Sequence, residues 1–255
     1  MDSAGRRFLL NTIDFVHFGK KQIHYEIIRT SRKKSVAIYV GPAVVKVRTP
    51  KRFSGEKIHS LVRKKAKWIF DRQEHIERER ELHPPKEFIS GESFPYLGKT
   101  YRLKVMLTEN GTDNSCHLKN GRLQVEIGKH LKGNEAKDAV KDALCTWYKE
   151  RVKSKIIERL PNLTRKLGRW PTSVQIKDQK SRWGSCSRNG VVRFNWKIIT
   201  APVSVMDYLI VHELCHLIHQ NHSAAYWKEI EAVLPDYKKM RDWLRIHNFI
   251  MSIFD

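Results

Sequence analysis

The stretch that most restricts what this chain can fold into is His212-Glu213-Leu214-Cys215-His216, which lies inside a strongly apolar run with helical periodicity. Two histidines four residues apart on a helix share one face and lie about 6 Å apart along the axis, so both imidazoles can bind one metal ion. A glutamate directly after the first histidine can reach a water at that ion and accept its proton. The stretch therefore predicts a metal site that performs hydrolysis.

A third ligand is needed, because catalytic zinc sites usually have three protein ligands and leave the fourth position to water. His219 shares the helical face of His212, but it lies about 10 Å further along a regular helix. His222 can reach back if the chain reverses after Gln220, and Asn221 tolerates the left-handed conformation that such a reversal needs. The predicted ligands of Zn2+ are three histidines: His212, His216 and His222.

The spacing of four and then six residues matches the long metzincin signature H-E-x-x-H-x-x-G-x-x-H. Here His219 stands in the place of the turn glycine, and no Met-turn is evident afterwards. A charged Glu213 in so apolar a helix is costly unless it has a partner or a role, which favours a functional glutamate. Cys215 points to the side of the histidine face and is interpreted as a small buried residue.

Length and composition predict a folded protein in a reducing compartment. The 255 residues, of 30.0 kDa in total, suffice for one large domain or two modest ones, and 40% are hydrophobic. The four cysteines are widely spaced without a C-x-x-C pair, which indicates neither a disulfide framework nor a zinc ribbon. No convincing signal peptide and no run of membrane-spanning length is present, so we expect a cytoplasmic protein without membrane association.

The chain is strongly basic, with 49 Lys and Arg against 27 Asp and Glu and a formal net charge of +22. Such a charge attracts polyanions, which favours contact with nucleic acid, nucleotides or an acidic protein. The alternative is an ordinary solvated basic surface. Both interpretations stay open, because the basic residues are spread along the whole chain.

Periodicity predicts an α+β fold in two parts. Residues 1–130 are expected to form a β-rich region with one basic helix, with strands within 22–48 and 93–127 and the helix at 54–81. Residues 131–255 are expected to begin with a helix at 134–160, which Pro161 ends. The expected remaining elements are strands at 174–177 and 191–196, the helix of the metal motif, and helices at 224–234 and 235–249. No internal repeat at solenoid spacing is evident.

Several short motifs occur in the order typical of YgjP-like metallopeptidase domains. They are Arg182-Trp183-Gly184-Ser185-Cys186, Phe194-Asn195-Trp196, Ala201-Pro202, Asp207-Tyr208, H-E-L-C-H, Asn221-His222-Ser223, Tyr226-Trp227 and Pro235-Asp236-Tyr237. The chain resembles this family over most of its length, and the family is similar to the WLM and SprT-like zinc proteases. The resemblance implies a compact zincin-like core in residues 131–255, zinc on the three histidines, and Glu213 as the general base. Tyr226 departs from the expected phenylalanine, although another aromatic ring is expected to keep the packing.

The leading hypothesis is therefore a zinc-dependent metallopeptidase that acts on a peptide or protein. Candidate substrate contacts are Arg182, Trp183 and Asn195, although Trp183 could instead pack in the core and Arg182 could pair with a carboxylate. The segment 191–196, if it is an edge strand, can bind an extended peptide by strand addition. An oxyanion could be stabilised by one of three tyrosines, each of which could instead simply be packed: Tyr208, Tyr226 and Tyr237.

Two other functions are compatible with the same residues. A metal-activated water could hydrolyse a nucleotide phosphoanhydride, as a pyrophosphatase does, although the chain has no P-loop motif. Alternatively, the chain could be a nucleic-acid-associated binding module with a zinc site, in which the helix at 54–81 and the turn at 29–34 contact phosphates.

Overall fold

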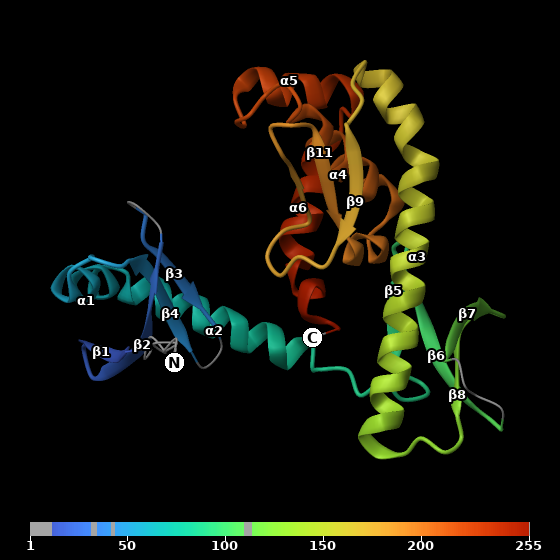
Figure 1. Cartoon of the computed structure of the whole chain (residues 1–255), viewed down its shortest axis with the longest axis horizontal. Helices are drawn as coiled ribbons and strands as arrows, with labels where there is room; N and C mark the ends of the chain where they lie inside the picture. The colour runs from blue at the N-terminus through green and yellow to red at the C-terminus, as the bar shows by residue number, and fades with distance from the viewer. Residues whose placement is uncertain (1–11, 32–34, 42–43, 110–113, 255) are drawn as a thin grey trace, which may run out of the picture. The chain divides into compact units, whose positions relative to one another are not determined.

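A computed structural model describes residues 12–31, 35–41, 44–109 and 114–254 (Figure 1). The chain divides into two compact units, one up to Pro84 and one from Pro85 onward. The described residues form three mixed sheets and six α-helices, which confirms the predicted α+β class. The expected division at residue 130 lies inside the second unit, and a functional boundary there stays a prediction. Among the helices of the described residues, none is both long and apolar enough to cross a membrane.

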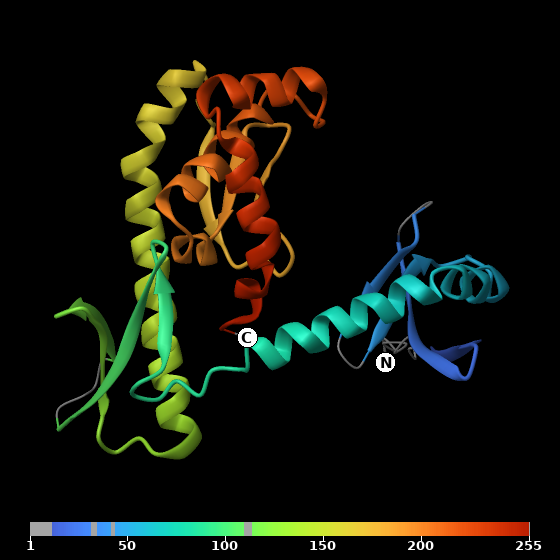
Figure 2. The ribbon, with the colours of Figure 1, turned by 180° about the vertical axis from the view of Figure 1, so that it is seen from behind.

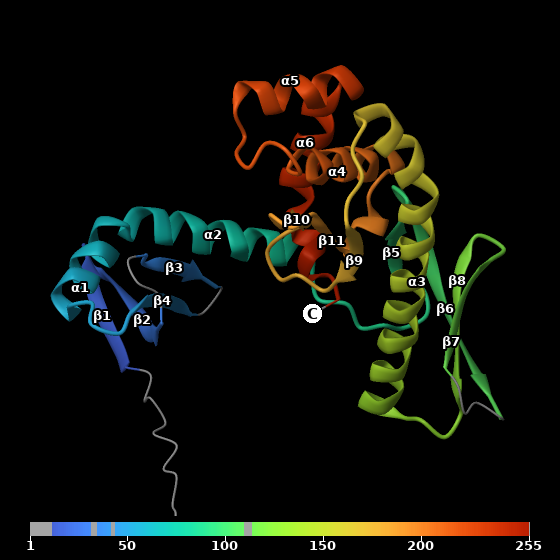
Figure 3. The ribbon, with the colours of Figure 1, turned by 45° about the horizontal axis from the view of Figure 1, so that its top comes forward.

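The first unit is a four-stranded sheet with two helices packed on one face (Figure 3). The strand order is β1 (Thr12–Phe18), β2 (Lys21–Thr30), β4 (Val45–Pro50) and β3 (Ala37–Val40). Burial alternates along these strands, so that Val45 and Val47 are buried while Lys46 and Arg48 are exposed. The sheet is therefore covered on one side only, as many antiparallel and mixed sheets are.

The predicted single helix at 54–81 is two helices, α1 (Gly55–Lys64) and α2 (Ala66–Leu82). The break is at Lys65, whose φ of −97° and ψ of 5° depart from helical values. The break lets both helices pack on the same sheet, α1 through Ile58 and α2 through Ile69, and both side chains are fully buried.

The second unit begins with another four-stranded sheet, which packs against the long helix α3 (Gly133–Leu167) (Figure 2). Its strand order is β5 (Ser93–Tyr96), β6 (Lys99–Thr108), β8 (Arg122–Gly128) and β7 (Ser115–Lys119). The prediction that Pro161 ends this helix was wrong. Proline removes the N–H that would bond the carbonyl of Ile157, but Ile157 lies on the exposed side of the helix, where water can replace that bond. The helix ends instead before Gly168, whose φ is +64°.

The first two sheets have the same topology, in which antiparallel, parallel and antiparallel pairs follow one another. Adding 78 to the residue numbers of the first sheet reproduces the pairing of the second. The corresponding pairs are Phe15↔His24 with Ser93↔Arg102, Tyr25↔Val45 with Leu103↔Leu123, and Ala37↔Arg48 with Ser115↔Glu126. The same shift relates Gly55, the first residue of α1, to Gly133, the first residue of α3. The chain thus contains one sheet-and-helix module twice, at a spacing far from that of a solenoid.

The remaining elements of the second unit form the region that carries the metal motif. A small sheet has the order β10 (Gly184–Cys186), β11 (Val191–Asn195) and β9 (Ser173–Lys177). After it come α4 (Val203–Cys215), α5 (Ala224–Val233), α6 (Tyr237–Ile246) and a final 3-10 helix (His247–Ser252). The condition set for strand addition at residues 191–196 is not met, because β11 pairs on both sides and β10 lies at the edge.

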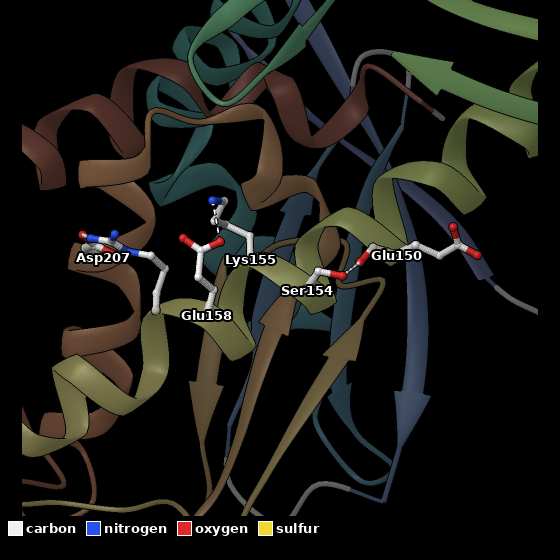
Figure 4. A network of polar contacts seen from close by, with 6 residues as sticks. Glu150, Ser154, Lys155, Glu158 and Asp207 are labelled. Atoms are coloured by element: carbon white, nitrogen blue, oxygen red, sulfur yellow. Dashed lines mark hydrogen bonds and ion pairs between the residues drawn. The ribbon is translucent and has the colours of Figure 1, made fainter. Parts of the chain in front are cut away.

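An ion pair joins α3 to α4. Arg159 Nε donates to Asp207 Oδ1 at 2.8 Å, and its Nη2 donates to the second carboxylate oxygen. Figure 4 shows Asp207 on α4 beside polar residues of α3. Two parallel hydrogen bonds of this kind fix orientation as well as distance, so the pair holds the helix of the metal motif in place.

Candidate metal centre

The three predicted histidines lie together at the end of α4 and in the loop that follows. His212 is in the last turn of the helix, and His216 directly follows its final residue, Cys215. The chain turns at residues 216–218, earlier than the predicted reversal after Gln220. This early turn brings His222, which directly precedes the N-cap of α5, back toward the helix.

The geometry of the three imidazoles fits a single small cation. One ligand nitrogen from each ring lies within 4.8 Å of the others, and Nε2 of His212 is 3.5 Å from Nε2 of His222. Two nitrogens bound tetrahedrally to zinc at about 2.0–2.1 Å are about 3.3 Å apart. Little movement is therefore needed to bring these nitrogens to one ion.

The hydrogen bonds of the rings leave their Nε2 atoms available for a metal. Nδ1 of His216 is 2.9 Å from the carbonyl oxygen of His219, which can only accept, so Nδ1 carries the proton in the neutral ring. Nδ1 of His212 is 2.6 Å from the hydroxyl of Tyr226, and that hydroxyl is 3.2 Å from the carbonyl of His212. If Nδ1–H donates to the hydroxyl and the hydroxyl donates to the carbonyl, every group is satisfied and Nε2 keeps its lone pair.

Burial lowers the pKa of two of these rings, those of His212 and His222. Desolvation, followed by repulsion from His216 and His222, lowers the pKa of His212 to about 3. Desolvation and His216 also lower the pKa of His222. Both rings are therefore neutral at pH 7, which is the form that binds a metal ion.

Glu213 projects from α4 into the interior of the second unit and is only 4% exposed. Desolvation raises the pKa of its carboxyl to about 8, and the charge of Arg182 opposes this shift. A dication at the histidines would favour the carboxylate form. A perturbed carboxyl beside converging imidazoles is typical of a catalytic site.

Gly184 on β10 provides the space for this carboxylate. A Cβ at Gly184 would lie 2.5 Å from Oε1 of Glu213 and 2.9 Å from both Cδ and Cγ. These distances are too short for any side chain larger than hydrogen unless Glu213 moves. The role of Gly184 could not be predicted from the sequence, because only the tertiary structure places it against Glu213.

The three predicted substrate contacts lie in different environments. Arg182 is exposed, and Trp183 is partly buried against the core of the second unit. Asn195 is fully buried, and its amide donates to the backbone carbonyls of Gln179 (2.7 Å) and Arg182 (3.0 Å). In this structure Asn195 fixes the segment that leads into β10, and direct contact of these three residues with a substrate stays a prediction.

The three candidate tyrosines are all buried, and the hydroxyl of Tyr226 is engaged with His212. The ring of Tyr226 is packed as expected and its hydroxyl also contacts His212, while stabilisation of an oxyanion by one of these tyrosines stays a prediction. Tyr237 stacks between Tyr208 and Trp227, and Trp227 in turn stacks on His222. These stacked rings from α4, α5 and α6 support the outer side of His222.

Three converging imidazoles beside a buried carboxylate are typical of a metal-dependent hydrolase. A sequence profile of the family described as "YgjP-like, metallopeptidase domain" matches residues 34–247. The chain therefore belongs to the YgjP-like metallopeptidase domain family. Membership makes the protein a metallopeptidase, a hydrolase that uses a metal ion and acts on peptides or proteins. It gives no support for a nucleic-acid partner.

Comparison with other proteins adds one structural likeness. The chain is similar to the crystal structure of the metallopeptidase zymogen of Pyrococcus abyssi abylysin, at 24% sequence identity and a TM-score of 0.34. The match covers 36% of this chain and 93% of the abylysin chain. No curated protein sequence matches the chain.

Proposed function

We propose that the protein is a zinc-dependent peptidase with Glu213 as its general base and three imidazoles as the ligands of the ion. The observation that supports this most directly is the convergence of His212, His216 and His222 beside the buried carboxylate of Glu213. Three imidazole nitrogen donors favour zinc over magnesium or calcium, which prefer oxygen ligands. The hydrogen bonds to Nδ1 of His212 and His216 hold both rings with Nε2 toward the common point.

A zinc ion bound there would supply a Lewis acid that polarises the scissile carbonyl and makes water acidic near neutral pH. Glu213 would accept a proton from the attacking water and deliver it to the leaving nitrogen. Gly184 leaves the space that this carboxylate occupies, burial raises its pKa, and the charge of Arg182 opposes that shift. Tyr226 would act through His212 as a positioning residue, because its hydroxyl bonds Nδ1 of the ring.

The edge strand β10 is where an extended substrate would pair with the enzyme. β10 pairs with β11 on one side only, and its first residue, Gly184, contacts Glu213. A peptide that added to its open edge would run directly beside the general base, with backbone hydrogen bonds that tolerate many sequences. This assigns to β10 the role that the sequence suggested for residues 191–196.

The test combines metal quantification with activity measurements on wild type and Glu213→Gln. We expect one zinc per chain in both proteins, peptide hydrolysis by the wild type, and a loss of about 10²–10⁴-fold in the variant. Casein and a mixed peptide library serve as substrates, and nucleoside triphosphates test the phosphoanhydride alternative. Hydrolysis confined to nucleotides, or peptide turnover that persists in Glu213→Gln, would refute the proposal.

A further inference from the structure

We propose that the open face of the first sheet binds single-stranded nucleic acid. This face is the side of β1-β2-β4-β3 that faces away from α1 and α2. It carries exposed aromatic rings together with basic side chains, and none of the residues of the predicted metal centre belongs to it. The inference is independent of the proposed catalytic mechanism.

Two aromatic rings lie exposed on this face, at the two edge strands of the sheet. Phe15 on β1 is 44% exposed and Tyr39 on β3 is 46% exposed. Their neighbours in sequence, Val16 and Ile38, belong to the core side, so the alternation of the strands places both rings on the open side. Leaving large rings in water is unfavourable, and exposed rings on a sheet can stack with unpaired bases.

Cationic and imidazole groups surround these rings. The guanidinium of Arg48 lies 5.0 Å from the centroid of Tyr39, and Lys46 on the same strand is exposed as well. Phe15 contacts the rings of His17 and His24, with centroids 5.4 and 5.8 Å away. Flat rings beside guanidinium and ammonium groups match a ligand that combines bases with phosphates.

The part of the chain that contains this face is also positively charged. Between positions 20 and 67 the sequence contains fifteen Lys or Arg and two acidic residues, Glu26 and Glu56. Among the described strand residues of this unit, Glu26 is the acid that shares the open face, and it pairs with Lys46 at 3.3 Å. An acidic protein would also be attracted by this charge, but it would not account for the exposed rings.

The internal duplication shows which properties belong to the module and which are particular to the first copy. The positions that correspond to Phe15 and Tyr39 in the second copy are Ser93 and His117. The buried positions agree, since Tyr25 and Val45 correspond to Leu103 and Leu123, all of which are buried. The module therefore does not need rings on its open face in order to fold, which favours a binding role for Phe15 and Tyr39.

Fluorescence anisotropy on the full chain tests the proposal. The probes are fluorescein-labelled oligothymidylate of about 20 nucleotides and the matching duplex, at several salt concentrations. We expect the single strand to bind more tightly than the duplex. The double variant Phe15→Ala/Tyr39→Ala should weaken single-strand binding by about tenfold or more. Arg48→Gln should reduce the slope of log affinity against log salt by about 0.7.

Two control variants separate stacking from charge and from misfolding. The conservative double variant Phe15→Tyr/Tyr39→Phe keeps both rings and should keep affinity within about twofold. Trp68→Ala removes an equally exposed ring (47%) from α2 and should leave binding unchanged. Circular dichroism melting verifies that each variant is folded.

Three outcomes would overturn the proposal. The first is that the folded wild type shows no binding at low salt. The second is that binding survives removal of both rings, or depends on Trp68 instead. The third is that polyglutamate displaces the oligonucleotide as well as unlabelled oligothymidylate does, which would indicate an acidic protein as the partner. Because Glu213→Gln leaves this face intact, loss of peptidase activity in that variant without loss of oligonucleotide binding distinguishes the two proposals.

Discussion

Replacing Gly184 by alanine tests the catalytic geometry, because it adds a single methyl group next to Glu213. The new Cβ would lie 2.5 Å from Oε1 of Glu213, so the carboxylate must retreat by roughly an ångström to reach ordinary van der Waals contact. It has little room to do so, because Glu213 is 4% exposed and its Cγ and Cδ are also within 2.9 Å of the new atom. A displacement of that size at a catalytic group costs about 10²-fold in rate.

The assay compares kcat for a cleaved peptide, zinc content and thermal unfolding in wild type and Gly184→Ala. We expect kcat to fall by about 100-fold while zinc content stays at the wild-type value. Overpacking should also cost about 1–3 kcal/mol of stability. Gly55→Ala is the matched control, because a Cβ at Gly55 meets no atom within 4 Å. It should leave kcat unchanged.

A double-mutant cycle separates displacement of Glu213 from a general effect on β10. Glu213→Ala removes Cγ, Cδ and Oε1, the three atoms that the new Cβ would approach, and the cycle is measured as the free energy of unfolding. In that background, Gly184→Ala should cost much less than in wild type. The reasoning is refuted if the folded Gly184→Ala protein keeps its full kcat, or if the substitution costs the same in both backgrounds.

Three further predictions concern the metal ion and the residues that hold the site in place. Removing the hydroxyl in Tyr226→Phe should lower zinc affinity by about 10–100-fold, because Nδ1 of His212 loses its nearer partner and keeps the hydroxyl of Tyr208 at 3.4 Å, and chelator competition measures this; unchanged affinity would show that the bond is incidental. Asp207→Ala should destabilise the protein by about 1–3 kcal/mol in urea unfolding, less than for a fully buried pair because Arg159 is 33% exposed; wild-type stability would argue against the pair. Treatment with a zinc chelator should abolish hydrolysis and lower the unfolding temperature, and added zinc should restore both; activity that resists complete removal of the metal would argue against a metal-dependent reaction.

Much of the fold could be predicted from the sequence, because periodicity is a local property. The alternation in residues 93–127 predicted strands where β5 to β8 lie, and the apolar helical periodicity around the metal motif predicted α4. β1 was not predicted, because its apolar residues lie on both faces and do not alternate: Ile13 and Phe15 are exposed and Val16 is buried. The break at Lys65 was not predicted, because it depends on the packing of both helices on one sheet. The continuation of α3 through Pro161 was not predicted either, because it depends on the exposure of the carbonyl that loses its hydrogen bond.

Part of the candidate site could likewise be predicted from the sequence, and the rest depends on the tertiary structure. The pairing of His212 with His216 follows from residues four apart on one helix, which the chain specifies without reference to any other segment. The edge position of β10, the fit of Gly184 against Glu213 and the bond from Tyr226 to His212 join segments that are far apart in sequence. Local spacing restricts neighbouring residues only, and contacts between distant segments exist only once a common core brings them together. The duplicated module was hidden for a related reason, because its two copies share burial and strand pairing rather than residue identity.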